Sequence, residues 1–148
     1  ITAQQLQRTF QTNIFSQFYL VQAARPHLKK GAAIVNCTSV TMYKGAPILL
    51  DYSATKGAIT AFTRSLSENL VGDGIRVNAV APVAGETPLL KSFMGEDTPE
   101  MRAKFVSTIP LGRFSTPEDM GNAACFLCSD EASMVTGVAM EVDGGRCI

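Results

Sequence analysis

The first 27 residues carry apolar side chains at helical spacing. Thr2 is followed three positions later by Gln5, which matches a capping box at the start of a helix. Beyond this pair, apolar positions recur about every four residues, at Leu6, Phe10, Ile14 and Phe18. This periodicity predicts a long first helix that reaches about His27.

Two later segments are apolar on both faces instead of on one. They are GAAIVNCTS, residues 31–39, and IRVNAVAP, residues 75–82, and both contain β-branched residues. A strand buried on both sides of a parallel sheet has this composition. We therefore predict two such strands, the second stopped by Pro82, and a third within VAMEVDGG near the end of the chain.

A second helical stripe lies between these two segments, after a loop that contains Gly45 and Pro47. From about Leu50, apolar residues recur three to four positions apart, at Ala58, Ile59, Phe62, Leu66 and Leu70. The sequence Gly-Asp-Gly at 72–74 is a stop signal. The pattern predicts a second long helix, opened by Tyr52.

The third quarter of the chain combines a loop with two helix starts. Residues 83–97 have mixed polarity with two Gly and one Pro, which predicts a mobile loop or lid. Thr98-Pro99-Glu100 and Thr116-Pro117-Glu118 each offer an N-cap, a Pro at the first helical position and an early acid. Helices and strands therefore alternate along the chain, which indicates an α/β protein with a parallel sheet.

Composition and charge indicate which classes of protein this chain can belong to. With 46% apolar residues in 148 positions, the chain is long enough for one folded domain. Thirteen basic residues balance thirteen acidic ones without forming blocks, so we expect no nucleic-acid or membrane partner. No apolar run approaches the ~20 residues that cross a bilayer, and the start has no signal-peptide pattern. We expect a cytoplasmic protein with a small-molecule partner.

The four cysteines invite a disulfide or metal interpretation. Cys125 and Cys128 form a C-x-x-C pair, but a tetrahedral metal site needs two more ligands, and His27 is the only histidine. We therefore expect no metal. In the absence of a secretory signal, reduced thiols buried as small core residues are favoured for these two and for Cys37 and Cys147.

The stretch YSATK, residues 52–56, contains two candidate catalytic residues. Tyr52 and Lys56 lie four positions apart, so in a helix they share one face about 6 Å apart along the axis. Ser39 stands where the chain leaves its first predicted strand, and ligands of open α/β sheets collect at the carboxyl ends of strands. The three side chains are therefore expected to converge.

Taken together, these motifs resemble the short-chain dehydrogenase/reductase family. The matching segments follow the family order from end to end: TFQTN, IVNCTS, YSATK, IRVNAVAP, ETPLL, LGRFSTPEDM, VTG and VDGG. The segments YSATKGAI and LGRFSTPEDM look most like sugar or polyol dehydrogenases and 3-oxoacyl reductases. The resemblance implies part of a Rossmann-like doubly wound sheet, NAD or NADP as cofactor, and a homo-oligomer, either a dimer or a tetramer.

The resemblance also implies a catalytic tetrad of Asn13, Ser39, Tyr52 and Lys56. Tyr52 would give a proton to the nascent alkoxide while hydride reaches the carbonyl carbon. Lys56 would lower the pKa of this phenol and hold the nicotinamide ribose. Ser39 would donate a hydrogen bond to the substrate oxygen. Asn13 would position a water that relays protons to Lys56.

Further roles follow from the same resemblance. Pro82, Gly85 and Thr87 look like the segment that contacts the nicotinamide, and Asn78 looks like a structural residue. The family usually has Gly directly after this Pro, whereas this chain has Val83, which would be strained at a positive φ. The loop from Val83 to about Pro110, including Phe93 and Met94, is expected to shape the substrate pocket.

One family motif has no counterpart in the sequence. No G-x-x-x-G-x-G turn follows a first strand, so residues 1–148 are expected to form a single partial Rossmann-like domain without its phosphate-binding half. Three explanations fit this missing motif. Residues 1–148 would be a fragment of a longer protein, a longer chain of which part is not included, or a half that pairs with another chain. Two hypotheses on function follow: an oxidoreductase interconverting an alcohol and a carbonyl, or a non-catalytic half acting only through its oligomerisation surfaces.

Overall fold

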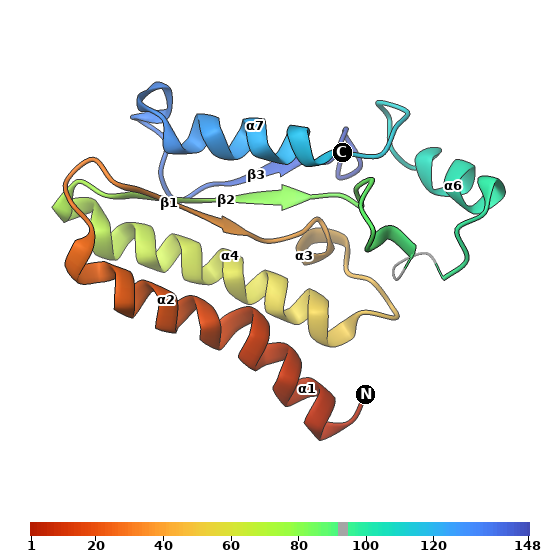
Figure 1. Cartoon of the computed structure of the whole chain (residues 1–148), viewed down its shortest axis with the longest axis horizontal. Coiled ribbons are helices and arrows are strands. Elements are labelled where there is room, and N and C mark those ends of the chain that lie inside the picture. The colour runs from red at the N-terminus through yellow and green to blue at the C-terminus, as the bar shows by residue number, and fades with distance from the viewer. Residues whose placement is uncertain (92–94) are drawn as a thin grey trace.

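Three parallel strands form the centre of the molecule (Figure 1). This computed structural model describes residues 1–91 and 95–148. The strands are β1 (Ala33–Cys37), β2 (Arg76–Pro82) and β3 (Ala139–Val142), in the order β1-β2-β3. Both neighbouring pairs are parallel. The predicted α/β class with about three parallel strands and flanking helices is confirmed.

The two predicted doubly buried strands differ in their surroundings. In β2, the five residues from Val77 to Ala81 are all buried. In β1, only Asn36 is buried and Cys37 is exposed. The prediction is right for β2 and wrong for β1, because β1 pairs with only one strand among the described residues and β2 pairs with two.

The first predicted helix is a run of consecutive helical segments. These are α1 (Ala3–Phe10), the π-helical turn η1 (Gln11–Phe15), α2 (Ser16–Ala24) and the 3-10 turn η2 (Arg25–His27). The hydroxyl of Thr2 accepts a hydrogen bond from the backbone N–H of Gln5 at 3.1 Å. The N-cap and the end near His27 are therefore confirmed. The π-helical turn was not predicted.

The second predicted helix is also present. It is α4 (Leu50–Leu70), followed by the 3-10 turn η3 (Val71–Asp73). Gly74 then adopts a left-handed conformation with φ of 70°, as the stop signal required. The segment predicted as a loop before α4 begins with one helical turn, α3 (Thr41–Lys44).

The remaining helices start at the two Thr-Pro pairs. They are α6 (Pro99–Val106) and α7 (Pro117–Cys128), and the 3-10 turn η4 (Asp130–Ala132) follows α7. The Thr98 and Thr116 hydroxyls accept the backbone N–H groups of Met101 and Asp119. Both predicted N-caps are confirmed.

The helices form layers on the two faces of the sheet. Helix α4 lies against one face with α1 and α2 outside it, and α7 covers the other face (Figure 1). The Phe18 ring of α2 meets the Phe62 ring of α4 with centroids 4.5 Å apart. One buried cluster, Leu70, Ile75 and Val77, joins the end of α4 to β2. A second, Val40, Val83 and Ile109, lies beyond the carboxyl ends of the strands.

The cysteines are not core residues, which corrects the prediction. Cys37, Cys125 and Cys128 are exposed and Cys147 is half-buried, and all four thiols are free. Cys37 belongs to the edge strand, while the buried residue of α7 is Leu127, between the two exposed cysteines. Apolar sequence neighbours alone therefore did not indicate which side of the helix faced the sheet.

The start of α7 provides a pH-dependent test of the fold. Arg113 donates hydrogen bonds to both carboxylate oxygens of Asp119, at 2.6 and 2.9 Å, and the backbone N–H of Thr116 donates another at 2.8 Å. The bonds from Arg113 first, then from Thr116, hold the pKa of this carboxyl far below its usual range. Because the folded pKa is the lower one, this stabilisation is complete above the unfolded pKa near ~3.9 and is lost as pH falls below it.

We therefore expect Asp119→Asn to lower the melting temperature near neutral pH. The difference from the unmodified protein should shrink as pH falls below about 4, because the carboxyl is then protonated in the unfolded chain. Thermal unfolding followed by circular dichroism measures both quantities. Glu118→Gln, at the exposed neighbouring position, is the control and should have a smaller effect. A difference that stays constant down to low pH would contradict the assignment.

Candidate active site

The candidate site lies where the carboxyl ends of β1 and β2 meet. Beyond the end of β1, the N–H of Thr38 donates to the carbonyl of Val80 at 2.9 Å, and the N–H of Val40 donates to Pro82 at 3.1 Å. These two bonds hold Ser39 between them. The first turns of α4 lie at the same end of the sheet (Figure 1). The strand ends thus place Ser39 on a rigid backbone.

Ser39 and Tyr52 are brought together at this point. Ser39 is only 7% exposed, and its hydroxyl accepts the backbone N–H of Thr41 at 3.2 Å. Burial raises the pKa of the Tyr52 phenol, whereas a hydrogen bond with the Ser39 side chain lowers it by less, so the pKa lies above its ordinary value. Tyr52 therefore keeps its proton at neutral pH.

Lys56 lies one turn further along α4, as the spacing predicted. Its Nζ is 5.3 Å from the centroid of the Tyr52 ring and donates to the carbonyl oxygen of Cys37 at 2.9 Å. Burial lowers the pKa of the Lys56 ammonium. Burial of the phenol is the largest influence on the pKa of Tyr52, so the lowering effect expected of Lys56 stays a prediction.

Asn13 reaches the same part of α4 from the π-helical turn. Its Nδ2 donates to the Thr55 hydroxyl at 2.9 Å, and this hydroxyl donates to the carbonyl of Tyr52 at 2.7 Å. Thr55 is fully buried, so the chain of contacts is shielded from solvent. Asn13 thus contacts the turn that separates Tyr52 from Lys56. π-helical turns inside α-helices are frequent at functional sites.

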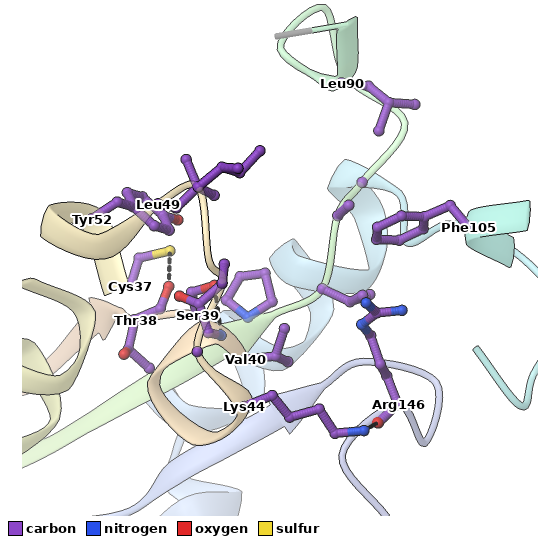
Figure 2. Close-up of a pocket in the computed structure, with 18 of the residues that line it drawn as sticks. Cys37, Thr38, Ser39, Val40, Lys44, Leu49, Tyr52, Leu90, Phe105 and Arg146 are labelled. Atoms are coloured by element: carbon purple, nitrogen blue, oxygen red, sulfur yellow. Dashed lines mark hydrogen bonds between the residues drawn. The ribbon is translucent and has the colours of Figure 1, made fainter. Parts of the chain in front are cut away.

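A pocket of about 320 Å³ opens beside these residues (Figure 2). Ser39 and Tyr52 line it, together with Pro82, Gly85 and Thr87. Lys56 and Asn13 are not among its lining residues. The predicted tetrad is therefore divided into two hydroxyls that face the pocket and two side chains behind them.

The loop after β2 follows a path that relieves the expected strain. The described residues include no non-glycine residue with a positive φ, so Val83 does not adopt the conformation in which it would be strained. Val83 is 5% exposed and packs with Val40 and Ile109. The close approach occurs at Gly85, where a Cβ atom would lie 3.0 Å from the Ser115 hydroxyl and 3.2 Å from its carbonyl oxygen.

Gly85→Ala is therefore expected to destabilise the protein by about 1 kcal/mol, because the added methyl group must displace the Ser115 backbone. Gly121→Ala is the matched control, since a Cβ atom there meets nothing within 4 Å in helix α7. The control should stabilise the helix slightly. Chemical unfolding measures both changes, and equal effects of the two substitutions would contradict the close approach.

Several pocket residues were not predicted. Leu49, Val40, Lys44 and Arg146 line the pocket, from segments far apart in the sequence. Ala84, Leu90 and Phe105 come from the segment expected to shape it, whereas Phe93 and Met94 lie outside the described residues. The only signal for the unpredicted residues was their position just after a strand or just before α4.

Within residues 1–91 and 95–148, no three His, Cys, Asp or Glu side chains are grouped so as to hold a metal ion. Of the described helices, none has the length and apolar character needed to cross a membrane.

Known proteins are similar to this chain along nearly all of it. The family described as enoyl-(acyl carrier protein) reductase matches residues 1–146. Uncharacterized oxidoreductase YhxC of Bacillus subtilis is 52% identical over 149 residues, which cover 100% of this chain and 51% of YhxC. Glucose and ribitol dehydrogenase of Daucus carota is 43% identical over 148 residues, covering 100% of this chain and 50% of the relative. The chain thus spans about half the length of the curated relatives it matches.

Solved structures share the fold. The 3-ketoacyl-(acyl-carrier-protein) reductase from Brucella melitensis, complexed with NADH, has a TM-score of 0.91 at 40% identity and is matched over 100% of this chain and 60% of its own. A protein described as an NAD(P)-dependent gluconate 5-dehydrogenase from Beutenbergia cavernae, with bound NADP, has a TM-score of 0.88 at 32% identity over 99% of this chain and 59% of its own.

These matches define the class as Rossmann-fold oxidoreductases. The chain belongs to the short-chain dehydrogenase/reductase family, as the motifs in its sequence implied. The expected cofactor, NAD or NADP, is the one bound in the two solved structures.

Proposed function

We propose that this protein is an NAD- or NADP-dependent oxidoreductase that interconverts an alcohol and a ketone or aldehyde. The observation that carries the proposal is the meeting of the Ser39 and Tyr52 hydroxyls in a pocket at the carboxyl ends of the strands. Family membership and the cofactors bound in the two solved structures support the same reaction class.

Tyr52 is proposed as the general acid of the reduction. NAD(P)H, when bound, supplies a hydride to the carbonyl carbon, and the carbonyl oxygen takes the Tyr52 proton as its C=O π bond breaks. The raised pKa of Tyr52 keeps the proton available for this direction near neutral pH. In the reverse direction the phenolate accepts the proton of the alcohol. Ser39 donates a hydrogen bond to the same oxygen, where negative charge develops.

Lys56 and Asn13 are proposed as the residues that support Tyr52. The Lys56 ammonium has three N–H donors, and one of them bonds to the Cys37 carbonyl, which leaves donors for the ribose hydroxyls of a nicotinamide cofactor. Asn13 fixes the turn between Tyr52 and Lys56 through Thr55. We also propose that Asn13 positions a water molecule that relays protons to Lys56.

The residues after β2 fit the nicotinamide end of the cofactor. Pro82, Gly85 and Thr87 all line the pocket beside Tyr52, and Gly85 brings the backbone close to its neighbours without a side chain. We propose that these three residues contact the nicotinamide. Among the described residues, β1 pairs with β2 alone, which supports the further proposal that residues 1–148 are part of a larger Rossmann-like domain, whose remaining strands bind the adenosine and phosphates.

A homo-oligomer is proposed from the outer face of the first helix. Phe15, Phe18, Tyr19 and Leu20 are each more than 40% exposed, so this helix presents several apolar side chains to solvent. Burial against another copy would remove this surface from water. The non-catalytic alternative rests on the same surface, and only turnover separates the two hypotheses.

The reaction class is tested by assaying the complete protein with NADH and NADPH on short ketones and aldehydes, and with NAD and NADP on polyols. Absorbance of the reduced nicotinamide reports turnover in both directions. Turnover with at least one pair supports the oxidoreductase. Oligomer formation without turnover of any substrate in a broad panel would favour the non-catalytic hypothesis.

A further inference from the structure

The end of the pocket away from Tyr52 carries two cationic side chains. Arg146 and Lys44 line this end, and Figure 2 shows Arg146 and Phe105 across the pocket from Tyr52 and Leu49. We propose that the pocket selects substrates that bear a carboxylate, separated from the reacting carbonyl by an apolar spacer, and that Arg146 binds this carboxylate. The inference rests on the proposed reaction at Tyr52 and extends it to the class of substrate.

Arg146 is held in place by the turn that follows β3. The Asp143 carboxylate accepts the backbone N–H groups of Gly145 and Cys147, both at 2.9 Å. Gly144 has φ of 64°, and a Cβ atom there would lie 2.6 Å from the Ile109 side chain. Because this turn admits little movement, the start of the Arg146 side chain is preorganised beside the pocket.

The guanidinium of Arg146 lies over an aromatic ring but has no acidic partner. Its centre is 4.5 Å from the centroid of the Phe105 ring. Its Nη1 is buried and has no hydrogen-bond partner among the described residues. Burial of a guanidinium donor without a partner is unfavourable, and a planar carboxylate is the ligand that best satisfies the parallel N–H groups of Arg. The guanidinium lines the pocket and takes part in no ion pair among the described residues, which favours an anionic ligand.

The charges around this end of the pocket also favour an anionic ligand. None of the described residues that line the pocket is acidic, and no ion pair within residues 1–91 and 95–148 includes Lys44 or Arg146. The Lys44 ammonium donates to the backbone carbonyl of Arg146 (Figure 2), which keeps a second cation at this end. The acid closest in sequence, Asp143, is already bonded to backbone N–H groups.

The apolar lining of the pocket is the reason for expecting an apolar spacer in the substrate. Apolar side chains make up much of the pocket lining, namely Val40, Ile48, Leu49, Val83, Leu90 and Phe105. A substrate with its carbonyl at Tyr52 and its carboxylate at Arg146 would lie against these side chains, and apolar atoms suit them because they offer no hydrogen-bond partners. A benzene ring that carries the two groups at opposite positions meets this requirement.

The test compares 4-formylbenzoate with 4-methylbenzaldehyde, which has the same ring but no charge. In the complete enzyme, kcat/KM should favour the carboxylate by about 10- to 100-fold, the range that charge-assisted hydrogen bonds supply. Arg146→Met keeps the apolar part of the side chain and should bring this ratio close to one. Using the ratio cancels any general loss of activity. Arg8→Met, which removes an exposed arginine of α1, is the matched control and should leave the ratio unchanged.

A ratio near one in the unmodified enzyme, or a preference retained in Arg146→Met, would overturn the inference. If neither aldehyde is reduced, the proposed reaction fails for these compounds, and binding decides the inference separately. Calorimetric titration with 4-formylbenzoate should then show a Kd at least about tenfold higher in Arg146→Met than in Arg8→Met. Absence of measurable binding to the unmodified protein, or equal Kd values in the two variants, would also overturn it.

Discussion

Replacing Tyr52 with Phe is expected to lower kcat by about 10²- to 10⁴-fold, the contribution that a positioned general acid makes. Phe keeps the ring, which lies 5.3 Å from the Lys56 ammonium, and removes only the hydroxyl. The hydrogen bond with Ser39 is lost, at a cost to stability of about 1 kcal/mol. Steady-state kinetics in the direction of reduction measures kcat, and circular dichroism verifies the fold.

Tyr43→Phe is the matched control for this substitution. Tyr43 lies in α3 near the pocket but does not line it, and burial followed by a hydrogen bond with Glu141 raises its pKa to about 12. Its phenol should contribute little to proton transfer. An unchanged kcat in Tyr52→Phe would exclude this residue as the acid, and equal losses in both variants would indicate a general effect on the fold.

Asn78→Ala is expected to produce the largest loss of stability. Asn78 is fully buried in β2, where its Nδ2 donates to the carbonyl of Val135 at 2.9 Å and its Oδ1 accepts the N–H of Val138 at 3.2 Å. Truncation leaves both backbone groups without these partners, so the free energy of unfolding should fall by about 3 kcal/mol. This loss corresponds to a melting temperature roughly 10 °C lower.

Asn122→Ala, at an exposed position of α7, is the control and should change stability little. The two Asn78 bonds help to hold the segment that leads into β3. Proteolysis or hydrogen exchange should report opening of residues 135–142 in Asn78→Ala before the rest of the sheet opens. A melting temperature equal to that of the control would contradict this structural role.

The helix ends show how far local signals reach. The caps at Thr2, Thr98 and Thr116 and the stop at Gly74 depend on residues within four positions, and the structure confirms all four. The π-helical turn and α3 were missed. Helix α3 has a single turn and no side-chain cap, and its Met42 sulfur contacts the Thr60 hydroxyl of α4, so its surroundings come from a distant part of the chain.

Burial was predicted less well than the elements themselves. An apolar run indicates a strand but does not say whether strands lie on both of its sides, so β1 was expected to be as buried as β2. Likewise, the surroundings of Cys125 and Cys128 in sequence did not indicate which face of α7 packs on the sheet. Both properties depend on neighbours that only folding brings near.

The sequence by itself determined the order of helices and strands, the α/β class and the placement of Tyr52 and Lys56 one helical turn apart, because these depend on periodicity, capping and fixed helical spacing. Only the tertiary structure decided that burial raises the pKa of Tyr52, that Gly85 makes the close approach, and that Arg146 reaches the pocket across from Tyr52. These properties arise from contacts between segments tens of residues apart. Desolvation, packing and unpaired charge exist only once those segments meet.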